Sequence, residues 1–221
     1  MDAQVHHIAT TTLSPTAFHG IRPITVPSPS VHLPYALGIF SSIFAMSLPA
    51  ALSSSSIPAL LRECHRVLTP TGTLCLTIMD PSPAAATLGP KLRAWLEDHL
   101  LLSLEKQFRC TSPGRLLPVW MKDAGFAIPS LSGTCTQITR MSFFAGGDGT
   151  RGEGDGDGDN STADAGELKT LVGRMLWKEI WGQFSDAEKW WWEDATILDE
   201  CRSYGTQWDC SIIKAGKIRR G

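Results

Sequence analysis

The chain has 221 residues and a formal charge of −2, and 43% of its residues are hydrophobic. This length suits one domain, or one domain with an insertion. The near-neutral charge gives no electrostatic reason to expect nucleic acid or an anionic membrane surface as a partner. The most apolar window, Tyr35–Leu48, is shorter than the roughly 20 residues that cross a bilayer. No basic residue precedes Arg22 and no apolar leader follows Met1, so we expect a cytoplasmic protein.

Residues 1–32 are rich in Thr, Ser, Pro and His and have no sustained apolar period. We therefore predict an irregular or disordered amino-terminal tail, with one short strand at Ile21–Val26. The apolar segment after it predicts a buried strand at Leu37–Ser41, followed by a loop or short helix through Met46.

A helix is predicted from about Ser56 to Leu68, because apolar residues recur at helical spacing and Pro58 suits a first turn. Thr69–Gly72 has turn chemistry, since proline fixes φ and glycine tolerates a positive φ. Thr73–Met79 is a nearly continuous apolar run, as expected of a parallel strand that is covered on both faces. Asp80 and the proline after it end that strand.

Three further elements are predicted before residue 146. Leu88–Phe108 has a long helical pattern, Ser112–Gly125 predicts a helix that ends in a glycine cap, and Cys135–Ala145 predicts a strand. The apolar positions that should share the inner face of the long helix are Leu92, Trp95, Leu96, Leu100, Leu104 and Phe108.

Residues 146–166 are a Gly- and Asp-rich, low-complexity segment that predicts a solvated linker. Glu167–Phe184 is amphipathic and is predicted to turn an apolar face inward. A second helix to about Ser203 and a final strand at Thr206–Ile218 follow. The residues expected on the inner face are Leu168, Leu171, Val172 and Met175.

Three segments together carry a family resemblance. The first is an R-V-L-x-P-x-G turn between a helix and a strand, the second is a Leu-Pro-aromatic lead-in to a strand, and the third is LLPVWMKDAGF at Leu116–Phe126. Taken in chain order, they resemble the carboxyl-terminal half of class I S-adenosylmethionine-dependent methyltransferases, of the type 11-like kind and with a fungal-type, Trp-rich helical insertion. The residues that carry the first two segments are Arg66, Val67, Leu68, Pro70, Gly72 and Leu74, and Leu33, Pro34, Tyr35, Ile39, Phe40, Ser41 and Ser42.

The resemblance implies an α/β fold that contains the last strands of a doubly wound, Rossmann-like sheet. It divides the chain into a tail (1–32), a partial methyltransferase-like α/β domain (33–145), a linker (146–166), and a helical insertion with the final strand (167–221). The insertion would lie between the last two strands, which are antiparallel. Its tryptophans either form a lid over an apolar substrate or pack as a layer on the sheet.

Ligands of open parallel sheets bind at the carboxyl ends of the strands. By resemblance, Ser41 and Ser42 would border the cofactor, S-adenosylmethionine, and Asp80 would border a pocket for a small-molecule substrate. The alternatives are small residues at a strand-to-loop turn and an Asp-Pro turn former. The pattern identifies no catalytic residue.

In this family a Gly-rich turn and an acidic residue hold the cofactor, and both precede the strand at Leu37–Ser41. Met1–His32 contains one glycine, Gly20, and one acidic residue, Asp2. We therefore expect that this chain alone does not bind S-adenosylmethionine.

Other motifs only resemble ligand sites. Gly147–Gly152 matches G-x-G-x-x-G, but it continues into an acidic stretch that forms helices poorly and repels anions. Three alternate aspartates follow, yet Asn160 and Gly166 stand where a calcium loop needs Gly and Glu. The six cysteines include no C-x-x-C pair. No metal site is expected.

Two functions remain open. The chain is a methyltransferase-like enzyme that acts on a small molecule, apparently truncated and inactive by itself. Alternatively, it is a non-catalytic remnant that binds a protein partner through its uncovered sheet edge. A gene model that lacks upstream exons would yield the same sequence.

Overall fold

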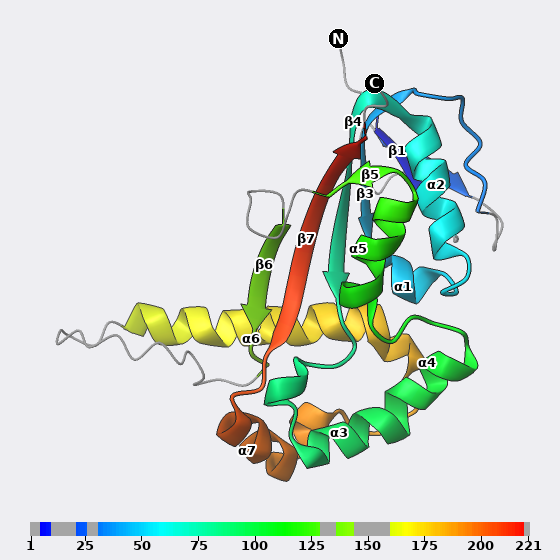
Figure 1. Ribbon diagram of the computed structural model, residues 1–221. Coiled ribbons are helices and arrows are strands. Elements are labelled where there is room, and N and C mark those ends of the chain that lie inside the picture. Colours follow the sequence, from blue (N-terminus) through cyan, green and yellow to red (C-terminus); the bar gives the residue numbers. More distant parts are fainter. Residues whose placement is uncertain (1–4, 10–20, 26–30, 129–135, 144–159, 219–221) are drawn as a thin grey trace.

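The chain forms a mixed sheet with helices, as the computed structural model in Figure 1 shows. The structure describes residues 5–9, 21–25, 31–128, 136–143 and 160–218. The described strands are β1 (Val5–Ala9), β2 (Ile21–Thr25), β3 (Phe40–Met46), β4 (Leu68–Met79), β5 (Phe126–Ala127), β6 (Thr136–Met141) and β7 (Trp208–Lys217). The α-helices are α1 (Leu48–Ala51), α2 (Ile57–Val67), α3 (Pro90–Leu96), α4 (Leu102–Lys106), α5 (Pro113–Asp123), α6 (Asn160–Trp181) and α7 (Ala195–Tyr204).

The order of the main sheet is β3-β4-β7-β5, and β6 also pairs with β7. β3 and β4 are parallel, whereas β7 is antiparallel to β4, β5 and β6. The predicted α/β class is confirmed. The prediction that the last two strands are antiparallel, with helices between them in the chain, is confirmed as well.

Two strands lie in the segment for which the sequence predicts a tail. β2 confirms the strand predicted at Ile21–Val26, and it pairs in parallel with β1. The prediction that the remainder is irregular is wrong at Val5–Ala9. The sequence of β1, VHHIA, does not alternate apolar and polar residues, so its local pattern does not indicate a strand. Its pairing partner is a strand that begins twelve residues further along the chain.

The first strand of the main sheet begins later than predicted. The sequence places it at Leu37–Ser41, whereas β3 spans Phe40–Met46. The backbone N–H groups of Gly38 and Ile39 donate to the carbonyl oxygens at the end of α2 rather than to β4, at 3.1 and 2.9 Å. Gly38 also has φ +69°, which is not a strand conformation. Pairing with β4 therefore starts only at Phe40.

The predicted turn at Thr69–Gly72 lies inside β4, whose bounds are Leu68–Met79. Phe40 pairs with Leu68 but Ser42 pairs with Thr73, so four residues of β4 stand opposite one residue of β3. The backbone at Gly72 lies close to Leu68, since a Cβ on Gly72 would be 2.9 Å from Cδ2 of Leu68. The turn residues were recognised correctly, but they produce an irregularity within the strand rather than a break before it.

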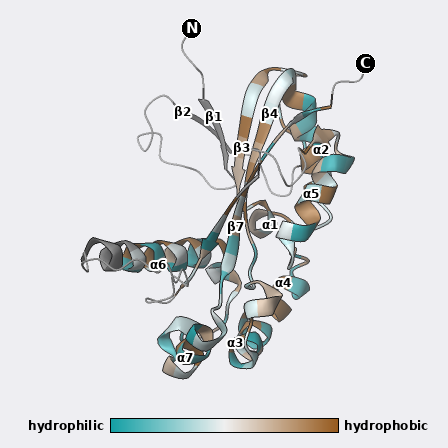
Figure 2. Ribbon diagram, turned by 60° about the vertical axis from the view of Figure 1, so that its left-hand side comes forward, coloured by the Kyte–Doolittle hydropathy of each residue, from teal (hydrophilic) through white to brown (hydrophobic). Residues whose placement is uncertain are grey.

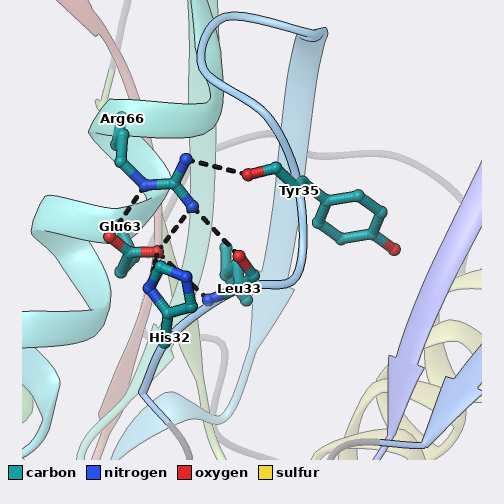
Figure 3. Close-up of polar contacts among 5 residues, drawn as sticks. All are labelled: His32, Leu33, Tyr35, Glu63 and Arg66. Atoms are coloured by element: carbon teal, nitrogen blue, oxygen red, sulfur yellow. Dashed lines mark hydrogen bonds and ion pairs between the residues drawn. The ribbon is translucent and has the colours of Figure 1, made fainter.

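Arg66, in the motif that carries the resemblance, fastens the lead-in of β3 to α2 (Figure 3). Its guanidinium donates to the carbonyl oxygens of Tyr35 and Leu33, at 2.8 and 3.0 Å, and to both carboxylate oxygens of Glu63. Glu63 in turn accepts from the backbone N–H of Leu33 and pairs with His32. The hydrogen bond from Arg66 lowers the pKa of Glu63. This cluster explains why the arginine and the Leu-Pro-Tyr lead-in occur together.

α2 and α5 cover one face of the main sheet, as Figure 2 shows. Alternate residues of β4 and β7 point into this layer and are buried against apolar residues of the two helices. Gly125, with φ +95°, ends α5 as the predicted glycine cap. The buried residues of this core include Leu61, Val67, Leu74, Leu76, Ile78, Leu117, Met121, Ile213 and Ala215.

The helix predicted at Leu88–Phe108 runs from Pro90 to Lys106 and has a π-helical segment, Glu97–Leu101, between α3 and α4. Four of its predicted inner residues, Leu92, Leu96, Leu100 and Leu104, are fully buried. These leucines are four residues apart, and in an ideal α-helix with 3.6 residues per turn such side chains would shift progressively around the axis. The wider π turn corrects this shift and keeps them on one face. Phe108 lies beyond the helix and is exposed, contrary to the prediction.

α6 begins at Asn160 rather than at Glu167, so the predicted linker ends earlier; Ala163 and Ala165 favour this extension. The remainder of the linker lies outside the described residues. Although α6 has 22 residues, no helix in the described ranges is long and apolar enough to cross a membrane.

The inner face of α6 was predicted wrongly. Its buried residues are Thr170, Gly173, Trp177, Ile180 and Trp181, whereas the four aliphatic residues expected inside are exposed. A tryptophan buries about 150–250 Å² of surface, more than an aliphatic side chain does, so the tryptophans decide the orientation of the helix. Gly173 assists, because a Cβ there would lie 2.6 Å from the ring of Phe143.

Candidate functional site

The carboxyl ends of β3 and β4 lie at the same edge of the sheet, where open α/β sheets bind ligands (Figure 1). β3 ends at Met46 and β4 ends at Met79. The residues that follow, Ser47 and Asp80, are therefore the first candidates for contact with a ligand. Ser47 has φ 59°, a left-handed conformation in which α1 turns away from the strand.

Asp80 is tied to the first turn of α5. Its Oδ1 accepts a hydrogen bond from the backbone N–H of Gly114 at 2.6 Å. A Cβ on Gly114 would lie 3.0 Å from Oδ2, so a small residue is required for this approach. Burial raises the pKa of Asp80, the hydrogen bond from Gly114 opposes this, and the charge of Asp209 adds to the rise. Asp80 therefore satisfies an N–H group that the helix itself leaves free.

Cys110 is buried next to this carboxylate. Burial raises the pKa of its thiol, and the charge of Asp80 raises it further. A protonated thiol is a poor nucleophile. This edge offers a ligand the carboxylate of Asp80. Its Oδ2 does not bond to Gly114 and can accept a hydrogen bond or a proton.

Ser41 and Ser42 do not lie at this edge. The sequence places them after the strand, but β3 continues four residues beyond Ser42. Ser42 pairs with Thr73, seven residues before Asp80, which is roughly 23 Å along a strand. Both serines are exposed, and the structure does not bring them together with Asp80. Their predicted contact with a cofactor stays a prediction.

Sequence reasoning missed Ser47. The signal was the start of α1, whose Leu-Pro-Ala sequence has the proline that suits a first helical turn. A strand that ends just before this turn must extend to Met46. The carboxyl-end residue is then Ser47, not Ser41 or Ser42.

The loop that follows Asp80 is held by the Trp-rich insertion. The carbonyl oxygen of Pro81 accepts from Nε1 of Trp177 at 3.0 Å and from Nε1 of Trp208 at 3.4 Å. Further along, Oγ1 of Thr206 donates to the carbonyl oxygen of Thr87 at 2.7 Å. The insertion thereby fixes the position of the backbone beside the candidate site.

Most of the large tryptophans of the insertion serve as a packing layer. Trp177, Trp181 and Trp191 are fully buried, and Trp191 stacks on Trp208 with ring centroids 5.1 Å apart. Of the two predicted roles, packing fits these positions better than a lid does. Trp190 is half-buried and lines a surface hollow of about 570 Å³ on α6, together with Met175, Lys178, Glu179, Gly182 and Gln183. None of the predicted site residues lines this hollow.

No group of side chains within the described ranges is arranged to hold a metal ion. The G-x-G-x-x-G segment and its aspartates fall in residues 144–159, outside the described part. At the carboxyl edge, Ser47 and Oδ2 of Asp80 are candidates for contact with a ligand.

No protein-family model and no curated protein matches the sequence. Among solved structures, the chain is similar to phosphoethanolamine N-methyltransferase 2 of Haemonchus contortus in complex with S-adenosyl-L-methionine, with TM-score 0.48 and 12% identity over 98% of this chain and 44% of that one. It is also similar to geranyl diphosphate C-methyltransferase of Streptomyces coelicolor (TM-score 0.39, 12% identity, 90% of this chain and 54% of that one). A third similar structure is the YcgJ protein of Bacillus subtilis (TM-score 0.43, 14% identity, 92% and 73%).

Two of these three are methyltransferases. The chain spans less than half the length of two Haemonchus contortus methyltransferase structures, 38% of one and 44% of the other. All of these TM-scores lie below 0.5, so the likeness carries no argument about what the chain does.

Proposed function

We propose that the chain is the acceptor-side part of an S-adenosylmethionine-dependent methyltransferase that acts on a small molecule. One observation carries the proposal. β3, α2 and β4 form a parallel unit, and an antiparallel final strand lies directly beside β4. This is the arrangement that the R-V-L-x-P-x-G resemblance implies, and Arg66 of that motif fastens the unit together.

In this proposal Asp80 borders the substrate and orients an acceptor oxygen, nitrogen or carbon atom. Methyl transfer from a sulfonium depends mainly on alignment of the reacting groups, so a positioned hydrogen-bond acceptor is a useful contribution. The donor would be held by residues that lie outside the described part, in a further segment or another chain. The cofactor role of Ser41 and Ser42 and the cytoplasmic location stay predictions.

The experiment compares this chain with a chain extended by any in-frame coding sequence upstream of Met1. Each is titrated with S-adenosylmethionine by calorimetry. We expect micromolar binding by the extended chain and no binding by the 221-residue chain. Binding by neither would refute the methyltransferase proposal. Micromolar binding by the 221-residue chain would instead show that it holds the donor by itself.

A second candidate function is protein binding through the edge of the sheet. β3 pairs only with β4 among the described strands, and its sequence FSSIFAM contains no charged residue and no proline. Phe44 and Met46 on this strand are 80% and 61% exposed. Edge strands of monomeric proteins normally carry charge or proline that prevents further pairing. Recovery of one stoichiometric partner, lost in a Phe44→Lys variant, would favour this function.

A further inference from the structure

α6 has an apolar stripe that the fold leaves in solvent. Its members are 47% to 63% exposed and recur at positions i, i+3, i+4 and i+7, so they lie on one side of the helix. The opposite side carries the buried tryptophans. The stripe consists of Leu168, Leu171, Val172 and Met175.

The spacing of the stripe is that of a helix that packs against another helix. It spans roughly 10 Å along the axis, about two turns. Beyond Met175 it continues into the hollow lined by Lys178, Gly182 and Trp190. A second helix laid along α6 therefore finds an apolar strip followed by a depression that admits a side chain.

Charged residues flank the stripe with opposite signs at its two ends. At 100° per residue, Glu167 and Lys178 fall on one flank, about 20° apart, whereas Glu179 falls in line with the stripe and lines the hollow. No ion pair forms at Glu167 or Lys178 within the described part of the chain, although Lys178 contacts the ring of Trp190. This flank thus presents a negative charge near one end and a positive charge near the other.

We propose that α6 packs antiparallel against α6 of a second copy of this chain. In an antiparallel pair, residues on the same flank of the two helices meet. A two-fold axis near residue 173 brings Glu167 to Lys178 of the second copy and, by symmetry, Lys178 to Glu167 of the second copy. The midpoint of this pair lies between residues 172 and 173.

The same register also fits the apolar side chains. Leu171 lies opposite Met175 of the second copy, and Leu168 of the second copy reaches the rim of the hollow at Lys178. The contact covers about two helical turns, so the area it buries is smaller than the roughly 800 Å² per partner of a standard interface. The dimer is therefore weak, and it depends on protein concentration.

Sedimentation equilibrium of the full chain, from about 2 to about 200 µM, measures this association. Glu167→Lys and Lys178→Glu each replace two symmetric attractive pairs by repulsive ones, so each should weaken the dimer by roughly tenfold. The double variant restores opposite charges across the interface and should recover the wild-type dissociation constant. Glu167 and Lys178 are too far apart on one helix to interact within a single copy, so recovery reports pairing between copies.

Leu171→Glu should abolish the dimer, whereas Leu102→Glu, at an exposed leucine of α4, should leave it unchanged. Circular dichroism confirms that each variant is folded. A chain that stays monomeric at the highest concentration overturns the proposal and leaves the stripe to another protein. A dimer that ignores the α6 variants, or a double variant weaker than both single variants, overturns it as well.

Discussion

Thr206 links the loop that follows Asp80 to the segment after α7 through one buried hydroxyl. Its side chain is fully buried, and Oγ1 donates to the carbonyl oxygen of Thr87 at 2.7 Å. The backbone N–H of Gln207 donates in return to Oγ1 of Thr87 at 3.2 Å. Thr206→Val keeps the volume and shape of the side chain but removes the donor. The carbonyl oxygen of Thr87, a half-buried residue, then loses this partner beside the fully buried side chain at position 206.

Loss of one partner at a buried acceptor costs about 1–3 kcal/mol in the free energy of unfolding. For a chain of this size, a loss of about 2 kcal/mol lowers the midpoint of thermal unfolding by about 4–8 °C. Thr206→Ser is the matched control, because it keeps the hydroxyl and loses one methyl group, worth about 1 kcal/mol.

Urea unfolding followed by tryptophan fluorescence gives the comparison, because the packing layer contains most of the tryptophans. We expect the valine variant to unfold at a lower urea concentration than the serine variant, with the same slope. A valine variant with the wild-type midpoint would show that the hydroxyl contributes nothing. A changed slope would point instead to a change in the unfolded state.

Three further predictions concern single residues. The folded-state pKa of Asp80 lies above its unfolded value, so its contribution to stability is greatest at low pH and is lost as pH rises through the folded pKa. Asp80→Asn keeps an acceptor oxygen and should stabilise the protein at neutral pH, with no gain in acid; a loss at neutral pH in urea titrations would contradict this. Gly125→Ala should cost about 1–3 kcal/mol, because φ is +95° and a Cβ would meet a histidine ring. Gly205→Ala, also at a positive φ but with open space, should cost less in the same assay, and equal losses would exclude the ring contact as a cause. Cys75 is half-buried and should react with a maleimide reagent before Cys64, whose pKa burial raises to about 12; peptide mapping after short labelling decides, and the reverse order would refute the argument.

Much of the fold could be predicted from local pattern. The helix before β4, the strand Thr73–Met79 and the final antiparallel strand have strong periodicity and clear turn residues. The start of β3 could not be predicted, because Gly38 and Ile39 belong to an apolar run that is typical of a strand. Their backbone N–H groups donate hydrogen bonds to the end of α2 instead of to β4. This error moved the predicted carboxyl end of the strand.

In the candidate site, too, local pattern predicted positions but not long-range contacts. Asp80 was placed correctly at the carboxyl end of β4, but its hydrogen bond to Gly114 connects positions 34 residues apart and leaves no trace in local sequence. The inner face of α6 was missed for a related reason. Periodicity finds an apolar stripe, but it does not tell a stripe that packs inward from one that stays in solvent.

β7 is the last of the described strands, yet it lies between β4 on one side and β5 and β6 on the other. The main sheet therefore cannot be completed until Trp208–Lys217 has left the ribosome. Until then β4 has an uncovered edge, and nascent chains are exposed to wrong partners and to chaperones. A stop codon within Trp208–Lys217 would remove part or all of the strand that joins both halves of the sheet, so it should be as harmful as a large deletion.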